Sequence, residues 1–158
     1  MSFATSYVNG YHLSQMLVNG AAYNLDTDSV RVSLYTDTIS SMDKNANEVK
    51  GSSPYTTNEV SYTSSSVTPG SGAAAGTLSN PAVTQSAGKI IFTDAGSATM
   101  AWTTATFTAR GAVIWDDTLT SPADPVLCAI NFGADKIVTA GTFTITWDAT
   151  NGIFYATY

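Results

Sequence analysis

Threonine alternates strictly with a large apolar residue over residues 142–147, and this pattern limits the fold more than any other feature of the sequence. Successive side chains of a β-strand point to opposite faces of a sheet, so the alternation predicts a strand with Phe143, Ile145 and Trp147 facing a core. Residues 148–152 follow with asparagine and glycine, which tolerate the positive φ of tight turns. Such a strand and turn are typical of an antiparallel sheet.

Short runs rich in β-branched and aromatic residues recur through the C-terminal half. Their spacing of roughly 8–12 residues is typical of antiparallel sandwiches and barrels. The predicted strands of this half are 89–93, 99–108, 111–115, 126–132, 142–147 and 153–157. A further strand is predicted at 30–36, with Val30, Val32 and Leu34 on its buried face. We therefore expect a mainly β protein, one antiparallel β-sandwich or jelly-roll-like domain that spans residues 1–158.

The N-terminal segment has the spacing of a helix. Phe3, Tyr7 and Tyr11 recur every four residues, and Gly20 is placed where a helix would end. One short helix is therefore predicted within 3–20.

Residues 37–88 are rich in serine, threonine, asparagine and glycine and contain few large apolar side chains. A plain loop of this length is rare inside a compact domain, so edge strands are expected at 55–62 and 78–83. The glycine-rich residues 69–76 predict a flexible loop, or an arm when a partner is present. Our candidate partner contacts in this region are Ser64, Pro69 and Gly72.

The charge of the chain limits its partners. Only 11% of the residues are charged, against about 25% in a typical domain, and 24 threonines and 18 serines supply much of the polar surface instead. Six basic residues and a net charge of −6 do not suit binding to nucleic acid or to an anionic membrane. No apolar run is long enough for a membrane-spanning helix, and residues 1–6 lack the pattern of a secretory signal, so we expect folding in a host cytoplasm.

Candidates for catalysis and metal binding are few. The single cysteine, Cys128, lies in an apolar run and is interpreted as a small buried side chain, and the single histidine, His12, as a packing or helix-surface residue. A hydrolase built on His12 is the remote alternative. Residues 43–54 begin like a calcium loop, but its glycine position holds Glu48 and its last ligand position holds Pro54. No enzyme activity, cofactor or metal is expected.

Two pairs of aspartates could supply carboxylate oxygens to a cation. These pairs are Asp26 with Asp28 and Asp116 with Asp117. Aspartates beside strand ends more often bind their own backbone in turns, so the turn-forming interpretation is preferred.

Tryptophans and one arginine are the remaining candidates for binding. Trp147 is expected in the core, whereas Trp115 lies beside a predicted turn, is expected to be partly exposed, and is the better candidate for stacking on a glycan. Arg110 is expected either to form an ion pair or to be a solvated charge at a strand edge. Its candidate partners are Asp116, Asp117 and Asp135.

Segments along nearly the whole chain resemble, in the same order, a family of small structural proteins of tailed bacteriophages. The matching segments are 25–34 (LDTDSVRVSL), 58–61 (NEVS), Trp102, 106–114 (TFTARGAVI), 130–136 (INFGADK), 141–148 (GTFTITWD) and 152–154 (GIF). The chain departs from the family pattern at 61–64, where the family has a Gly-Tyr-Thr stretch, and at Asn131, where aspartate is common.

The resemblance implies a virion component with no catalytic residues to carry over. The resemblance leaves open whether the protein lies on the head or the tail, and we expect a capsid cement or decoration protein that stabilises the head shell through contacts with the major capsid protein. It also implies a symmetric homo-oligomer, with a trimer preferred. Low charge, abundant hydroxyl groups and a flexible arm suit many weak, hydrated contacts on a capsid lattice. The alternative is a tail or baseplate-associated adhesin that binds host-surface glycans through Trp115.

Overall fold

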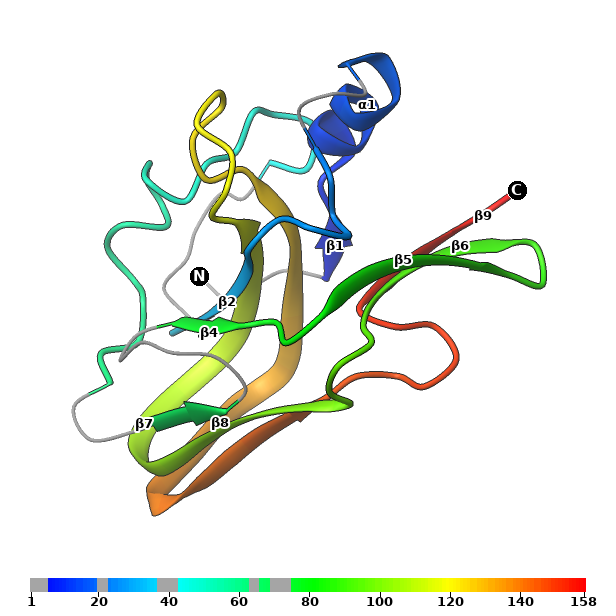
Figure 1. The fold of residues 1–158 in the computed structure, drawn as a ribbon. Coiled ribbons are helices and arrows are strands. Elements are labelled where there is room, and N and C mark those ends of the chain that lie inside the picture. Colours follow the sequence, from blue (N-terminus) through cyan, green and yellow to red (C-terminus); the bar gives the residue numbers. More distant parts are fainter. Residues whose placement is uncertain (1–5, 20–22, 37–42, 63–65, 69–74) are drawn as a thin grey trace.

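Two antiparallel sheets and one short helix make up the computed structural model, which describes residues 6–19, 23–36, 43–62, 66–68 and 75–158 (Figure 1). The elements are β1 (Tyr7–Val8), α1 (Gly10–Asn19), β2 (Val30–Tyr35), β3 (Ser66–Thr68), β4 (Ala75–Thr77), β5 (Pro81–Ser86), β6 (Lys89–Asp94), β7 (Thr99–Asp116), β8 (Val126–Thr146) and β9 (Phe154–Thr157). The larger sheet has the order β1-β8-β7-β2-β4, with β3 also paired to β7, and the smaller sheet has the order β5-β6-β9. A mainly β, antiparallel sandwich-like fold with one short helix is confirmed, and the jelly-roll strand order stays a prediction.

The larger sheet is buried on both faces, because different parts of the chain cover them. On one face Val32, Leu34 and Trp102 form a core with Phe92 of the smaller sheet. Alternate positions of the same strands point the other way and pack under residues 43–62. This second core contains Tyr35, Tyr55, Val113 and Trp115. The predicted alternation of β2 is confirmed, and burial of both faces explains why its neighbour β7 is apolar almost without interruption towards its end.

The strands predicted at 99–108 and 111–115 form one strand, β7, and those at 126–132 and 142–147 form another, β8. These two strands pair along their lengths, with shifts of register at several points. Thr104, Gly133 and Ala140 have positive φ values of 55°, 78° and 47° at or beside the shifts. The extra residues form bulges that bend the hairpin and let pairing resume beyond each of them (Figure 1).

The helix begins later than predicted. Tyr7 belongs to β1 and pairs with Ala129 of β8, so its inclusion in the helix was wrong. Asn9 ends the strand and caps α1, because its side-chain oxygen accepts a hydrogen bond of 3.2 Å from the backbone N–H of His12. The predicted helix positions Phe3 and Gly20 lie outside the described residues.

The prediction of a strand at 55–62 was wrong. These residues form turns and an isolated bridge between Glu59 and Tyr35. Their aromatic and β-branched side chains cover the larger sheet instead of extending it. The strand predicted at 78–83 begins only at Pro81. The carboxylate of Asp94 accepts hydrogen bonds from the backbone of Ser79 and Asn80, and this holds the preceding residues in a bend.

The alternation at 142–147 is confirmed. Phe143 and Ile145 are half-buried, the threonines between them are exposed, and Trp147 is buried. Trp147 lies just after the end of β8 and its backbone N–H bonds to the carbonyl of Ala98. The apolar side chains at this end of β8 are therefore only partly covered by the core, and a cavity lies beside Phe143 and Ile145.

Candidate functional site

The outer edge of β8 is paired over only a short stretch within the described residues. Of the described strands, β1 lies beside this edge and pairs with Cys128 and Ala129. The backbone N–H of Asn131 donates to the hydroxyl of Ser6, and from Phe132 to the end of β8 no strand in the described part of the chain pairs with this edge. An unpaired edge offers backbone N–H and C=O groups to another strand.

A groove follows this edge, between β8 and the residues that lead into β9. Its first part is a cavity of about 440 Å³, and its second part is a cavity of about 340 Å³ that continues towards β1. Ile130, Gly152 and Ile153 line both parts, so the two cavities are contiguous. We call this feature the edge groove.

The edge groove combines apolar walls with one available cation. The half-buried side chains of Phe132, Phe143 and Ile145 line it, as does the exposed Lys136. Lys136 forms none of the ion pairs found among the described residues. The groove can therefore hold apolar side chains and, near Lys136, a carboxylate.

A tight turn shapes the opposite wall of the groove. The carboxylate of Asp148 accepts hydrogen bonds from the backbone of Thr150 at 2.9 Å and of Asn151 at 2.7 Å, and these bonds lower the pKa of Asp148. Gly152 follows at a φ of +65°, where a Cβ atom would lie 2.4 Å from the carbonyl oxygen of Phe92. The wall approaches β6 this closely because residue 152 has no side chain.

Arg110 is paired, as one of the two interpretations expected. Its guanidinium lies 3.5 Å from the carboxylate of Asp135, one of the three candidate partners. The pair spans the register shift between β7 and β8, where Gly111 faces Asn131 and Ala109 faces Lys136. The ion pair therefore links the two strands where β8 bulges, next to the edge groove.

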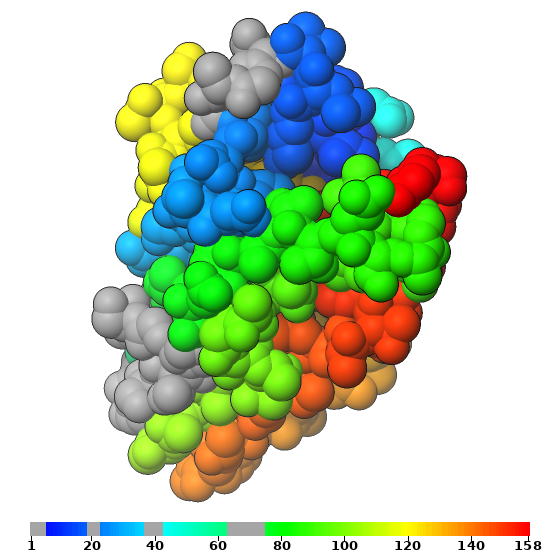
Figure 2. All heavy atoms as spheres, turned by 45° about the vertical axis from the view of Figure 1, so that its right-hand side comes forward, coloured from blue at the N-terminus to red at the C-terminus, as the bar shows by residue number. Residues whose placement is uncertain are grey.

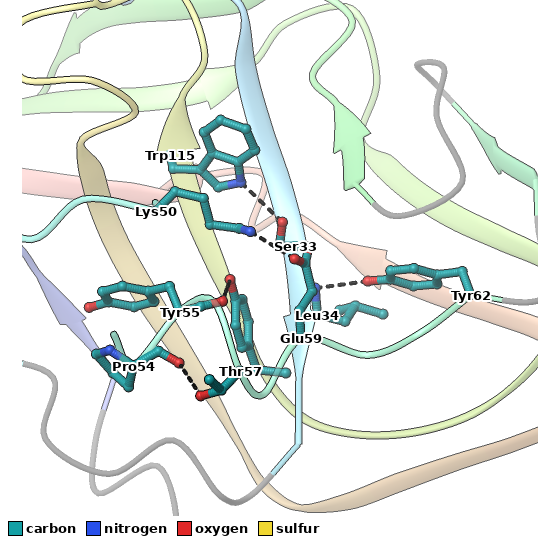
Figure 3. A network of polar contacts seen from close by, with 10 residues as sticks. Ser33, Leu34, Lys50, Pro54, Tyr55, Thr57, Glu59, Tyr62 and Trp115 are labelled. Carbon is teal, nitrogen blue, oxygen red and sulfur yellow. Dashed lines mark hydrogen bonds and ion pairs between the residues drawn. The ribbon is translucent and has the colours of Figure 1, made fainter. Parts of the chain in front are cut away.

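The expectation that Trp115 is partly exposed was wrong. Its side chain is only 7% exposed, and its indole N–H donates a hydrogen bond of 3.0 Å to the hydroxyl of Ser33 (Figure 3). The Lys50 ammonium lies 5.5 Å from the ring centroid and the Arg31 guanidinium 5.8 Å from it. Residues 43–62 cover this face of the sheet, so the ring offers no open platform for a sugar.

Contacts around Trp115 hold the covering segment on the sheet. Lys50 forms an ion pair of 2.7 Å with Glu59, and the hydroxyl of Tyr35 donates to the backbone carbonyl of Tyr55 (Figure 3). On the other side of β2, the hydroxyl of Tyr62 accepts a hydrogen bond from the backbone N–H of Leu34. This network has a structural role, because its polar groups bond to other residues of the same chain.

The candidate contacts Ser64, Pro69 and Gly72 lie outside the described residues.

His12 is a fully buried packing residue, and its ring nitrogens are both engaged. Nε2 lies 2.7 Å from the backbone carbonyl of Glu48, which can only accept, so Nε2 carries the proton. Nδ1 then accepts a hydrogen bond of 2.7 Å from the hydroxyl of Tyr23. Burial lowers the pKa of His12 and keeps the ring neutral. The packing interpretation is confirmed, and this geometry does not suit general-base catalysis.

Cys128 is expected to be chemically inert in the folded protein. Its side chain is 2% exposed, and burial raises the pKa of the thiol well above its ordinary value, so little thiolate forms. We expect no measurable reaction with Ellman's reagent at pH 8 and complete reaction of one thiol after denaturation in guanidinium chloride. Rapid reaction of the native protein would contradict the buried position on β8.

Asp116 and Asp28 form a buried carboxyl pair. The carboxylate of Asp116 accepts hydrogen bonds from the backbone of Thr118 and Leu119, and that of Asp28 accepts one from Asn24, so the turn-forming interpretation is confirmed for both. Burial, together with the neighbouring charge of Asp28, raises the pKa of Asp116 to about 6. In the folded protein Asp116 is therefore mostly protonated below about pH 6 and ionised above it.

Replacing Asp116 by asparagine is expected to stabilise the protein at pH 8 and to have little effect at pH 4. The folded pKa lies above the unfolded one, so wild-type stability from this group falls as pH rises from about 4 to about 6. The neutral amide keeps the acceptor oxygen and removes this loss, which predicts a gain of about 3 kcal/mol at pH 8. Urea unfolding at both pH values measures the gain, with Asp43→Asn as the control, because Asp43 is exposed and forms no ion pair among the described residues. An equal change at both pH values would count against a raised pKa.

Two searches within the described residues are negative. No helix there is long and apolar enough to cross a membrane. No three histidine, cysteine, aspartate or glutamate side chains of this part of the chain gather in a way that could hold a metal ion.

Comparison with protein families, with curated proteins and with solved structures finds no significant match to this chain. The resemblance to bacteriophage structural proteins therefore depends on the sequence segments described above and stays a prediction.

Proposed function

We propose that this chain is a non-enzymatic structural protein of a tailed bacteriophage virion, which decorates and stabilises the capsid by binding the major capsid protein. The sequence resemblance supports the choice of virion. The edge groove carries the proposal. From Phe132 onward no described strand pairs with this edge of β8, and a strand edge with apolar pockets beside it can bind an extended segment of another chain.

The chemistry of the groove suits such a segment. The edge of β8 offers main-chain hydrogen bonds, while Phe132, Phe143 and Ile145 offer apolar contacts to every second side chain of an added strand. Lys136 favours a segment that has an acidic residue nearby. Each contact is weak, but a lattice repeats the site many times, and a symmetric homo-oligomer gains affinity by binding several sites together.

The alternative function was a tail or baseplate-associated adhesin that uses Trp115 to stack on a glycan. Because the ring is buried between Lys50, Arg31 and the covering segment, its position favours the capsid role over the adhesin.

The copy number of the chain in purified virions tests the proposal. Quantitative mass spectrometry against the major capsid protein is expected to give a count of the same order as that protein. A few copies per particle would place the chain on the tail or neck and support the adhesin. Absence from the virion would discard both functions.

Charge reversal at the groove tests the site separately. Lys136→Glu is expected to weaken binding of the purified chain to capsids that lack it by at least tenfold, because the substituted side chain repels an acidic segment. Lys44→Glu changes the net charge equally at an exposed position that does not line the groove, and it is expected to bind normally. Equal loss in both variants would show a general charge effect and contradict the groove as the contact.

A further inference from the structure

A second surface of the molecule is unusually apolar. Leu17 and Val18, near the end of α1, are 83% and 81% exposed. On the neighbouring sheet, exposed apolar side chains come from β5, from β6 and from the residue after β9. These are Val83, Ile90 and Tyr158. Figure 2 shows α1 in blue, β5 and β6 in green and β9 in red beside one another on this face. We call these residues together the apolar face. Tyr155 of β9 pairs with Ile91 and points to the opposite face of this sheet.

The apolar face contains both a projection and a hollow. Leu17 and Val18 project from the helix, since most of each side chain is in solvent. Beside them lies a cavity of about 330 Å³ between the helix and the smaller sheet. Its lining is apolar and includes Leu13, Met16, Val83, Ile90, Phe92 and Phe154.

The size of the face is that of an interface. Its five exposed side chains present on the order of 600 Å² of surface, the size of the largest apolar patches on typical monomers (~300–600 Å²), which are often functional, and this approaches the ~800 Å² that each partner buries in a standard interface. An exposed apolar surface of this size promotes aggregation when the chain stays monomeric.

The charges of the surrounding residues are held within the chain. The Lys89 ammonium lies on the opposite face of the smaller sheet, where it bonds to the side chain of Asn151 and lies 4.5 Å from the centroid of the Tyr155 ring. The carboxylate of Asp26 accepts a hydrogen bond from the backbone N–H of Val83. These charges are already bonded within the chain, so the face does not need a partner of opposite charge. A second apolar surface is the partner that fits it.

We propose that the apolar face is the interface of a two-fold symmetric dimer of this chain. A two-fold axis brings the same patch of both copies together, so each residue meets a residue that it contacts in return. Because projection and hollow lie side by side on one face, this rotation places Leu17 and Val18 of each copy over the hollow of the other. The dimer goes beyond the proposed function, since it does not depend on where the chain resides, and it takes the place of the trimer that the resemblance implies.

Sedimentation velocity of the purified full chain tests the dimer. At about 100 μM, well above the Kd of a standard-size interface, the wild-type protein is expected to have twice the 16.5 kDa mass of one chain. The double variant Leu17→Ser, Val18→Ser is expected to weaken association at least 100-fold and to sediment as a monomer. Both side chains are largely in solvent in one copy, so the variant is expected to keep the far-UV circular dichroism and thermal unfolding of a folded monomer.

Ile137→Ser is the matched control, because Ile137 is 75% exposed and lies on β8 away from the apolar face. It is expected to leave the dimer intact. A monomeric or trimeric wild-type protein at this concentration would overturn the proposal, and so would a dimer that the double variant leaves unchanged. None of these results bears on the virion copy number, so the two proposals fail separately.

Discussion

Replacing Trp102 by alanine is expected to lower the free energy of unfolding by about 3–5 kcal/mol, the range found when a large aromatic side chain is removed from a core. Trp102 is fully buried in the middle of β7 and lies between the two sheets. Its ring stacks on that of Tyr62, with 6.4 Å between centroids and 11° between planes, and its centroid lies 5.7 Å from that of Phe143. Alanine leaves a cavity that these neighbours cannot fill.

Equilibrium unfolding in guanidinium chloride, followed by far-UV circular dichroism, measures the loss. Trp102→Phe is the control, because it keeps an aromatic ring and removes a buried indole N–H that has no hydrogen-bond partner within the described structure. We expect it to cost about 1 kcal/mol, since part of the lost packing is offset by removal of the unpaired donor. Equal destabilisation by alanine and phenylalanine would show that the volume of the ring is not what matters.

Gly152→Ala is expected to destabilise the protein by about 3 kcal/mol, through left-handed backbone strain and a steric clash. The added Cβ atom would lie 2.4 Å from the carbonyl oxygen of Phe92 and 2.8 Å from the side chain of Ile91. A backbone carbonyl of a paired strand cannot move away without loss of pairing between β6 and β9. The residue also lines both parts of the edge groove, so the substitution is expected to reshape the groove.

Two other glycines separate the causes. Gly133 has a positive φ of 78°, but no atom lies within 4 Å of the place that a Cβ would take, so Gly133→Ala is expected to cost only about 1 kcal/mol. Gly51 has neither a positive φ nor a neighbour, and Gly51→Ala is expected to be nearly neutral. Urea unfolding of the three variants under one condition gives the comparison. If Gly152→Ala costs no more than Gly133→Ala, close approach to β6 is not the constraint.

The candidate sites were predictable only in part. An ion pair of Arg110 was one of two expectations and Asp135 one of its three candidate partners, because the sequence does not tell which aspartate lies near the arginine in space. The burial of Cys128 followed from its apolar neighbours. The edge groove was not predicted, because nothing in the residues of β8 says which of its two edges will be paired. The exposed pair at the end of α1 had a local signal, two adjacent apolar residues at 17 and 18 that cannot both face the core.

Local sequence by itself determined the mainly β class, the buried face of β2 and the positions of the core residues near the end of β8. Side-chain direction in a strand has a period of two residues, so alternation states which side chains are buried wherever a strand forms. The threonines of 142–147 and the apolar residues between them needed no information from elsewhere in the chain.

Tertiary structure alone decided where strands join and which faces are covered. β7 and β8 continue through bulges because each supplies the other's hydrogen-bond partners on both sides of every irregularity, an effect that neither segment shows by itself. Trp115 is buried because residues 43–62, distant in the sequence, lie over it and bring Lys50 to its ring. Contacts between segments that are distant in the sequence decide which side chains become buried and which edges or faces stay uncovered. A local sequence pattern carries no information about such contacts.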